Sequence, residues 1–481
     1  MSLWNRREFL RISACGAAGL AVPGILSAEA SKETVRLGFI GVGGRGFYLT
    51  SFVPKIQNAV VAAVCDPDAE RLAAAKKQWP DAVACADMRE IFDDASIDAV
   101  VIATCNHWHC LAAVRGMEAG KDVYVEKPLG MNFREGRAVV EAAQKYGKMC
   151  QIGTQMRSDP VFHPEVKRFL HEEKALGAIQ SVRINRFAAR RGIGLRQEPL
   201  VIPSSVDYNL WLGPAQETPL YRDKLQYDWH WMWRTGHGEF GNWGAHLIDD
   251  CRNDILCDQV RMPKRVLVGG GRVGYNDAGQ TPNEAFVFFD TGTIPVVFCV
   301  SNLPDKTNGK SAGKCPGPTS GYIAYGEGGR YEKHWGGAVA FDSDGKKIRE
   351  FTGTSESEGA KPHLQSFVDA VLTRDKTKLN APIEVGCDSS AWYNSANVAY
   401  RLARPFSKAD ALAVPGTEGR LAEALGDLET HLTAQGIEIN ADTFQLSDFL
   451  QIDEANERFT GERADDANAL LEIPYRDGFV L

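Results

Sequence analysis

Apolar residues in the first third of the chain occur in short unbroken runs, and the segments between these runs have helical composition. Unbroken runs are typical of strands buried on both faces, as in a parallel sheet. Gly120 and Gly147 end two of the helical segments. The predicted strands are 35–40, 60–64, 82–85, 98–103, 123–125 and 149–152, and the predicted helices are 68–79, 111–119 and 133–146. Six strands joined by right-handed helical crossovers predict a doubly wound parallel sheet that ends near Gly153.

Beyond residue 155 the pattern changes to an alternation of apolar and polar residues. Such alternation is typical of strands with one packed face and one partly polar face. It occurs at 181–186, 265–268, 285–289 and 295–300. This part of the chain predicts an α+β domain with a large, open, mixed or antiparallel sheet. A Gly- and Lys-rich segment at 305–321 predicts a long loop, and the acidic composition from Asp410 onward predicts a mostly helical tail.

A glycine-rich sequence follows the first predicted strand in the order G-x-G-x-x-G. Gly41 allows the tight turn from strand to helix, Gly43 lets a pyrophosphate approach bare backbone, and Gly46 lets the helix pack on the sheet. Phosphates then lie at a helix N-terminus, where free N–H groups and the helix dipole favour negative charge. The residues expected to contact a dinucleotide in this loop are Gly41, Val42, Gly43, Gly44, Arg45 and Gly46.

An acidic residue follows the second predicted strand. Asp66 lies about twenty residues after Gly46, where a carboxylate accepts hydrogen bonds from the adenosine ribose and repels a 2′-phosphate. The alternative is an ordinary strand–helix turn with an exposed aspartate. Strand, glycines and acid in register favour a Rossmann fold that binds NAD rather than NADP. The fold class is therefore α/β, with an NAD-binding Rossmann domain at 34–154, a substrate and oligomerisation domain at 155–405 and a helical tail at 406–481.

Length and composition limit the class of protein. A chain of 481 residues is long enough for two domains, and 44% hydrophobic with 24% charged residues is typical of a globular protein. A net charge of −8 and a pI near 5.8 argue against nucleic acid or an anionic membrane surface as a partner. No Cys-x-x-Cys pair occurs, and no cysteine spacing requires a disulfide.

The first thirty residues have the pattern of a twin-arginine signal peptide. Arg6 and Arg7 are followed by Phe-Leu, by a weakly apolar stretch at 12–26 and by a small-x-small cleavage site at 28–30. The apolar stretch is too short to span a bilayer stably. The alternative is an N-terminal helix of a cytoplasmic protein. We expect the twin-arginine export machinery to recognise residues 1–30, which predicts a periplasmic protein with no membrane contact after cleavage.

Two polar motifs follow the fourth and fifth predicted strands, at the carboxyl ends where such sheets bind ligands. The first is T-C-N-H-W-H at 104–109, and the second is E-K-P at 126–128. Together with the glycine loop, these motifs resemble the Gfo/Idh/MocA family, the oxidoreductases related to glucose–fructose oxidoreductase and inositol dehydrogenase. The resemblance covers about residues 35–404.

The resemblance implies roles for individual residues. Lys127 would be the catalytic lysine, turned inward by a cis bond at Pro128. Glu126 would hold a ribose or the carboxamide edge of the cofactor. The residues implied to line the nicotinamide side are Thr104, Asn106 and His109, and those implied where the two domains meet are Gln155, beside the cofactor, and Arg157, beside the substrate.

The second half of the family's active site is usually an Asp and a His four residues apart on one helix. Here Asn242 and His246 hold these positions and are expected to share a helix face that points into the cleft. An amide carries no charge, so it cannot raise the basicity of His246 as a carboxylate would. Asp249 and Asp250 lie one turn further on and are candidates to supply that charge, and Asp249 is also a candidate substrate ligand.

Several candidate residues have structural alternatives. His107 and His109 are residue types that bind metals, but no third ligand is placed by spacing, so no metal is expected. Trp231 and Trp233 belong to an aromatic cluster before the expected catalytic helix. They fit either a packed core or stacking against a sugar ring.

These residues predict an exported NAD-dependent oxidoreductase that acts on a secondary hydroxyl of a sugar or polyol. The hydroxyl would lose its proton to His246 while Lys127 donates a hydrogen bond to the developing alkoxide. The alternatives are a core histidine and a surface lysine. Because twin-arginine export carries folded proteins, NAD is expected to be loaded before export and held tightly.

Two other functions stay open. In a redox-neutral glycosidase, oxidation enables elimination of the glycosidic substituent, and hydride is then returned. Trapped NAD and Asn242 favour this activity more than the family at large does. A non-catalytic sugar-binding protein or sensor would keep the fold without turnover. Open sheets of this family often pair face to face, so a homo-oligomer is expected.

Overall fold

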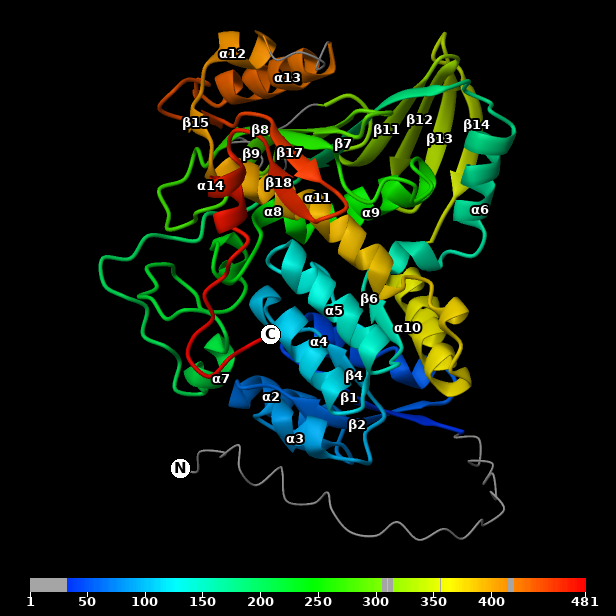
Figure 1. Ribbon diagram of the computed structural model, residues 1–481, viewed down its shortest axis with the longest axis vertical. Helices are drawn as coiled ribbons and strands as arrows, with labels where there is room; N and C mark the ends of the chain where they lie inside the picture. The colour runs from blue at the N-terminus through cyan, green and yellow to red at the C-terminus, as the bar shows by residue number, and fades with distance from the viewer. Residues whose placement is uncertain (1–32, 305–308, 310–314, 355, 414–418) are drawn as a thin grey trace, which may run out of the picture. The chain divides into compact units, whose positions relative to one another are not determined.

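The structure is a computed structural model that describes residues 33–304, 309, 315–354, 356–413 and 419–481 (Figure 1). The expected signal peptide at 1–30 and most of the expected loop at 305–321 lie outside the described residues. Within the described ranges, no helix combines the length and apolar character needed to cross a membrane.

A six-stranded parallel sheet in the order β3-β2-β1-β4-β5-β6 confirms the predicted doubly wound fold. Asp68, Asp87 and Asn132 accept backbone N–H bonds at the first turns of α2, α3 and α5, which fixes where these helices begin. The strands are β1 (Val35–Ile40), β2 (Ala59–Cys65), β3 (Val83–Cys85), β4 (Ala99–Ile102), β5 (Asp122–Val125) and β6 (Cys150–Ile152), and the helices are α1 (Arg45–Thr50), α2 (Ala69–Gln78), α3 (Met88–Asp93), α4 (Asn106–Glu118) and α5 (Phe133–Lys145). Because β1 pairs with both β2 and β4, strand order reverses at β1 and a ligand crevice opens at its carboxyl end.

The second sheet has twelve strands and is mixed, as predicted. Strand β7 pairs in parallel with β10, and the other pairings are antiparallel. Its strands are β7 (Ile179–Phe187), β8 (Arg265–Gly271), β9 (Glu284–Asp290), β10 (Val296–Ser301), β11 (Ser320–Gly326), β12 (Gly329–His334), β13 (Gly337–Asp342), β14 (Lys347–Thr352), β15 (Arg404–Pro405), β16 (Gln445–Leu446), β17 (Leu450–Asp453) and β18 (Arg458–Thr460). The helices after residue 155 are α6 (Phe162–Lys167), α7 (Tyr208–Leu212), α8 (Gly238–Asn242), α9 (Gly244–Asp254), α10 (Glu356–Thr373), α11 (Ile383–Arg401), α12 (Lys408–Ala413), α13 (Arg420–Ala434) and α14 (Ala464–Ala469).

The expectation of one partly polar sheet face is wrong for the central strands. Strands β8, β9 and β10 are buried along almost their whole length. One face packs against α9 and α11, and the other packs against α13, which contributes Leu421, Leu425 and Leu428 (Figure 1). Buried and accessible positions alternate more at β12 to β14 and at β17, where the expectation fits better.

The sequence predicts a mostly helical tail after residue 406, and this prediction is wrong. The tail contains both helices and strands. Helices α12, α13 and α14 are present, yet β16 and β17 both pair with β8 and extend the sheet. These strands have only two and four residues, which is too short to appear as a pattern in an acidic segment. The chain then returns to the nucleotide-binding domain and ends beside α4 (Figure 1).

Candidate active site

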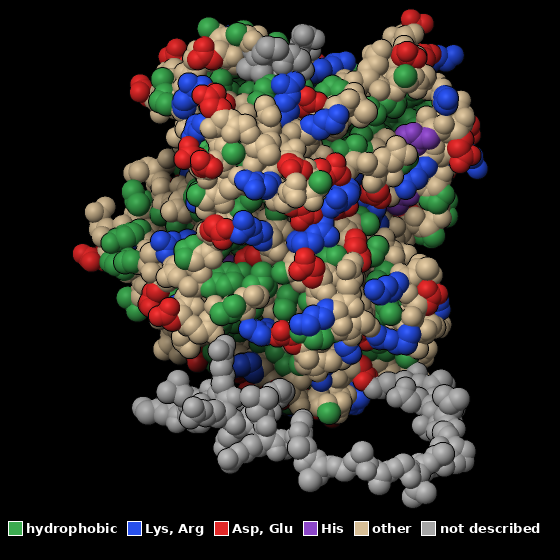
Figure 2. All heavy atoms as spheres, in the orientation of Figure 1, with side chains coloured by type: hydrophobic (Ala, Val, Ile, Leu, Met, Phe, Trp, Pro, Cys, Tyr) green, Lys and Arg blue, Asp and Glu red, His purple; other side chains and the backbone are tan. Residues whose placement is uncertain are grey.

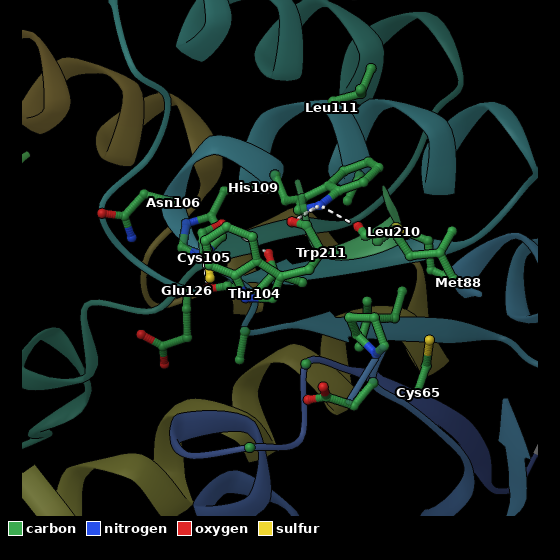
Figure 3. Close-up of a pocket in the computed structure, with 18 of the residues that line it drawn as sticks. Cys65, Met88, Thr104, Cys105, Asn106, His109, Leu111, Glu126, Leu210 and Trp211 are labelled. Atoms are coloured by element: carbon green, nitrogen blue, oxygen red, sulfur yellow. Dashed lines mark hydrogen bonds between the residues drawn. The ribbon is translucent and has the colours of Figure 1, made fainter. Parts of the chain in front are cut away.

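A cavity of about 910 Å³ extends along the carboxyl ends of the first sheet and on to α8 and α9. This volume is in the range of pockets that enclose a small-molecule ligand or cofactor. Figure 3 shows Cys65 and Met88 at one end of the labelled residues, and Asn106 and Glu126 at the other. The cavity therefore connects the end of β2 with the end of β5.

The glycine loop has the geometry that a dinucleotide requires. Gly41 has a φ of +85°, which favours glycine, and a Cβ on Gly46 would lie 2.0 Å from the carbonyl oxygen of Gly41. Gly41, Gly43, Gly44 and Arg45 line the cavity. Val42 does not line it but is buried, and Gly46 serves helix packing. The loop therefore fits the pyrophosphate of a dinucleotide.

Asp66 lines the cavity at the end of β2, as the sequence predicts. Its carboxylate accepts the N–H of Val42 at 2.9 Å and the N–H of Asp68 at 3.0 Å, and burial raises its pKa to about 6. Arg71 was not predicted, although it also lines the cavity and forms an ion pair with Asp68 at 3.5 Å. A Cβ on Gly43 would lie 2.0 Å from Nη1 of Arg71. This guanidinium is therefore next to the glycine loop. The sequence feature that could have indicated it is a basic residue in the first turn of the helix after Asp66.

Glu126 lines the cavity and is held by a buried hydrogen-bond network. Its Oε1 accepts bonds from Arg45 at 3.0 Å and from Gln155 at 2.8 Å. Its Oε2 is buried and has no hydrogen-bond partner in the part of the chain that the structure describes. A buried unpartnered carboxylate oxygen is costly unless a ligand supplies a donor, so Glu126 fits the hydroxyl of a ribose or a carboxamide N–H. Gln155 lies behind Glu126 rather than on the cavity wall.

Lys127 reaches from the nucleotide-binding domain to α8. The Lys127–Pro128 bond is cis, as the resemblance implies, and Nζ of Lys127 donates to the carbonyl oxygen of Asn242 at 2.7 Å. His109 has its two ring nitrogens 2.8 Å from the carbonyl oxygen of Pro128 and 3.1 Å from that of Thr104. His109 therefore joins the segments that follow β4 and β5, next to Lys127.

Thr104, Asn106 and His109 line the cavity as predicted, and α4 begins at Asn106, five residues earlier than the predicted helix. Nδ1 of His237 lies 3.2 Å from Oδ1 of Asn106. His107 has its Nε2 3.2 Å from the carbonyl oxygen of Trp211. Within the described ranges, no three His, Cys, Asp or Glu side chains are grouped as metal ligands.

His246 lines the cavity opposite the nucleotide-binding domain. Asn242 also lines the cavity, so both residues reach the cleft as predicted. They do not share one helix, because α8 ends at Asn242, α9 begins at Gly244 and Trp243 lies between them. Nδ1 of His246 is buried and has no hydrogen-bond partner among the described residues. Burial, together with the charges of Lys127 and Arg45, holds the pKa of His246 well below its ordinary value.

Comparison with known proteins decides the family. An oxidoreductase family described by an NAD-binding Rossmann fold matches residues 35–154, and its C-terminal alpha/beta domain matches residues 192–296. The chain belongs to the Gfo/Idh/MocA oxidoreductase family.

Individual relatives match only part of this Gfo/Idh/MocA protein. It is 30% identical over 177 residues to an alpha-N-acetylgalactosaminidase of Shewanella oneidensis, across 31% of this chain and 39% of that one. It is 31% identical over 143 residues to a scyllo-inositol 2-dehydrogenase (NAD(+)) of Bacillus subtilis, across 28% of this chain and 40% of that one. The chain thus spans about two fifths of the length of these curated relatives. The fold is similar to that of the WlbA dehydrogenase from Bordetella pertussis, solved with NADH and UDP-GlcNAcA, with a TM-score of 0.54, 17% identity and coverage of 76% of this chain and 96% of that one.

A buried carboxylate lies three residues before Asn242, the position at which the resemblance implies an aspartate. Glu239 is buried, and its Oε2 lies 3.4 Å from the donating Nδ2 of Asn242. Its Oε1 accepts bonds from Arg186 at 2.8 Å and Arg190 at 3.2 Å. Burial alone would raise the pKa of Glu239, but the charges of Arg190 and Arg186 outweigh it and lower the pKa. Glu239 could have been predicted to lie near Asn242, because residues three apart in a helix are neighbours. No feature of the nearby sequence indicates that Arg186 and Arg190 pair with Glu239.

The prediction that Arg157 and Asp249 bind the substrate is wrong, because the two side chains form an ion pair with each other. Nε of Arg157 lies 2.7 Å from Oδ2 of Asp249, and its Nη1 lies 2.8 Å from Oδ2 of Asp258. Asp250 lies 3.8 Å from Nζ of Lys333. Neither Arg157 nor Asp249, nor Asp250, is among the described residues that line the cavity.

The predicted sugar-stacking residues are also wrong. Trp231 is buried, and Trp233 packs against Tyr400 with ring centroids 6.1 Å apart. Both side chains therefore pack in the core, which was the alternative to sugar stacking. The cavity is instead lined by their neighbours Trp229 and His230. Residue type identified the aromatic cluster, but only the turn of the backbone decides which rings face the cavity.

Proposed function

We propose that the protein is an NAD-dependent oxidoreductase that acts on a secondary hydroxyl of a sugar or polyol. The observation that carries this proposal is that one cavity joins the glycine loop and Asp66 to Lys127 and His246. A dinucleotide held by the first pair of features extends toward the second pair, which has the acid–base chemistry that alcohol oxidation needs.

The residues at the inner end of the cavity have complementary roles. When bound, NAD supplies the acceptor for the hydride of the substrate carbon. His246 is neutral because its pKa is lowered, so it can accept the hydroxyl proton. Lys127 donates a hydrogen bond to the oxygen as negative charge develops there. The Trp243 ring lines the cavity, and the guanidinium carbon of Arg186 lies 4.1 Å from its centre. Arg186 therefore adds positive charge behind this part of the cavity wall.

We also propose that NAD is tightly bound and that the enzyme is exported by the twin-arginine route as a homo-oligomer. A long segment at 188–237, between β7 and α8, covers part of the cavity through residues such as Trp211, Tyr227 and His230 and supports tight binding. Its Ser205 carbonyl accepts the N–H of Ala69 at 2.8 Å, and the Trp108 indole donates to the carbonyls of Leu210 and Trp211 (dashed in Figure 3). Cell fractionation of the protein with Arg6 and Arg7 replaced by lysines tests export, and light scattering tests the oligomer.

The experiment that tests the function starts with protein purified from cytoplasm. The protein is denatured, the supernatant is assayed for NAD and NADP, and the native protein is incubated with a panel of sugars and polyols while absorbance at 340 nm is recorded. Bound NAD and substrate-dependent NADH formation are expected. Lys127→Ala should retain bound NAD and lose the absorbance change. A wild-type protein that neither contains nor binds a dinucleotide would contradict the proposal.

A redox-neutral glycosidase is the second candidate. The covered cavity favours it, because a trapped cofactor must be regenerated within each cycle, and one partial relative is an alpha-N-acetylgalactosaminidase. Cleavage of a chromogenic glycoside without added NAD supports this activity over net oxidation. Accumulation of NADH in proportion to substrate supports the oxidoreductase.

A further inference from the structure

The last ten residues of the chain, 472–481, form a strap that crosses the nucleotide-binding domain (Figure 1). The strap leaves the core at Leu471, whose carbonyl oxygen accepts a bond from Nδ2 of Asn132 at 2.9 Å. Glu472 pairs with Arg134, and the Tyr475 hydroxyl donates to Oε1 of Glu135 at 2.5 Å. These contacts attach the start of the strap to the first turn of α5.

The middle of the strap binds the segment at 188–237 that covers the cavity. The N–H of Arg476 donates to the carbonyl oxygen of Pro214 at 2.9 Å, and its Nη2 donates to the carbonyl oxygen of Asn209 at 3.0 Å. Gln216 donates to the carbonyl oxygen of Pro474 at 3.2 Å. The two segments, more than 200 residues apart in sequence, therefore form one continuous cover.

The end of the strap lies on α4 and faces the cavity. The Phe479 ring meets the Trp108 ring edge-on with centroids 5.6 Å apart, and Nη2 of Arg115 donates to the carbonyl oxygen of Val480 at 2.8 Å. Gly478, Phe479 and Val480 all line the cavity. Hydrophobic side chains gather on this face where the chain ends beside α4 and α5 (Figure 2).

This end of the cavity is the end expected to hold adenosine. Asp66, at the end of β2, is the residue type and position that holds the adenosine ribose in this fold, so the base lies beyond it, toward β3 and α4. Apolar side chains that suit an adenine ring line this end, namely Met88 and Phe92 from α3 and Leu111 and Ala112 from α4. The same two helices also contribute charged residues, including Arg89 and Arg115. Gly478, Phe479 and Val480 of the strap add a further wall at this end.

We propose that residues 472–481 are part of the cofactor site, where they enclose the adenosine end of the dinucleotide and retain it between turnovers. This inference rests on the proposed function. Removal of the Phe479 ring takes away an apolar wall of the compartment, and burial of such a side chain corresponds to a roughly 10- to 100-fold change in dissociation rate. The reaction itself is carried by Lys127 and His246 at the other end of the cavity.

The test compares full-length protein with Phe479→Ala and with a chain that ends at Leu471. Phe341→Ala is the matched control, because Phe341 is a partly buried ring under Arg330 in β13, away from the cavity. Bound NAD is replaced by fluorescent etheno-NAD, and its dissociation is followed after addition of excess NAD. Thermal unfolding is recorded for each variant, and Phe479→Ala keeps the test decisive if the shortened chain does not fold.

The expected result is a roughly 10- to 100-fold faster release from Phe479→Ala, and wild-type release from Phe341→Ala. Carboxypeptidase should also remove the last residues more slowly from wild-type protein with NAD than without it, because binding and strap closure are thermodynamically linked. Equal release from wild type and Phe479→Ala overturns the strap while leaving the proposed function intact. A wild-type protein that binds neither NAD nor NADP overturns both.

Discussion

Replacement of Asn242 by aspartate tests why this protein departs from the aspartate expected there. The Nδ2 of Asn242 donates to Oε2 of Glu239 across 3.4 Å, and Glu239 is already ionised between Arg186 and Arg190. An aspartate at 242 would replace this donor with a second carboxylate. We therefore expect Asn242→Asp to destabilise the site rather than restore a simple dehydrogenase.

The magnitude follows from the distance. Two unit charges 3.4 Å apart repel by on the order of 5 kcal/mol at an effective dielectric constant of about 20. Arg186 and Arg190 offset part of this repulsion, so the free energy of unfolding should fall by roughly 2–4 kcal/mol at pH 8. Repulsion raises the folded-state pKa of one carboxyl above its unfolded value. The loss is thus absent below about pH 4 and grows as pH rises through the folded-state pKa.

Urea unfolding at pH 5 and pH 8 measures this effect. Asn242→Ala is the control, because it removes the same hydrogen bond without adding a charge. A second cycle repeats both substitutions in a Glu239→Gln background, where the repulsion is gone. The reasoning is refuted if Asn242→Asp and Asn242→Ala are equally stable at pH 8, or if the extra loss from aspartate persists beside Glu239→Gln.

Three other outcomes are expected. Lys127→Met should keep bound NAD but lower kcat by about 100-fold or more, and a kcat within threefold of wild type would show that this lysine is not catalytic. Because the pKa of His246 is lowered, its imidazole stays neutral on mild acidification, so kcat/KM should fall only below the ordinary histidine range; a half-loss at pH 6.5 or above argues against His246 as the base. Gly46→Ala places a Cβ 2.0 Å from the carbonyl oxygen of Gly41, so it should lower the free energy of unfolding by about 1–3 kcal/mol and abolish NAD binding. Gly426→Ala, in open space in α13, should keep wild-type stability and NAD binding. Intact NAD binding by Gly46→Ala would contradict the predicted loop packing.

The features that sequence reasoning predicted correctly are local ones. Gly41 and Asp66 follow directly on a strand, Lys127 is the second residue after β5, and parallel strands bring their carboxyl ends to one edge of the sheet. A short stretch of sequence is then enough to place a side chain in the crevice. This is why the glycine loop, the acid after β2 and the lysine after β5 all line the same cavity.

The wrong assignments concern residues whose role depends on a distant partner. Arg157 and Asp249 have the charges of substrate ligands, but the structure pairs them with each other across 92 residues of sequence. Trp229 and Trp231 are two residues apart in the sequence, yet Trp229 lines the cavity and Trp231 does not. Residue type states what a side chain can bind, and the fold decides whether a neighbour in the protein has already bound it.

The cover over the cavity is the feature that no local pattern predicts, and it connects the site's chemistry to its architecture. Asp68 and Pro67, directly after the acid that marks a dinucleotide site, pair with Val206 and Asp207 in the segment at 188–237. The same segment bonds to the C-terminal strap through Asn209 and Pro214. A lone strand–loop–helix unit leaves the crevice open to solvent, so a cofactor exchanges readily. Here three parts of the chain meet over the same crevice, and we expect each contact made by the cover to raise the barrier to cofactor release without altering the residues proposed to transfer the proton. We therefore expect cofactor retention and catalysis to change independently in this protein, because separate ends of one cavity are proposed to serve them.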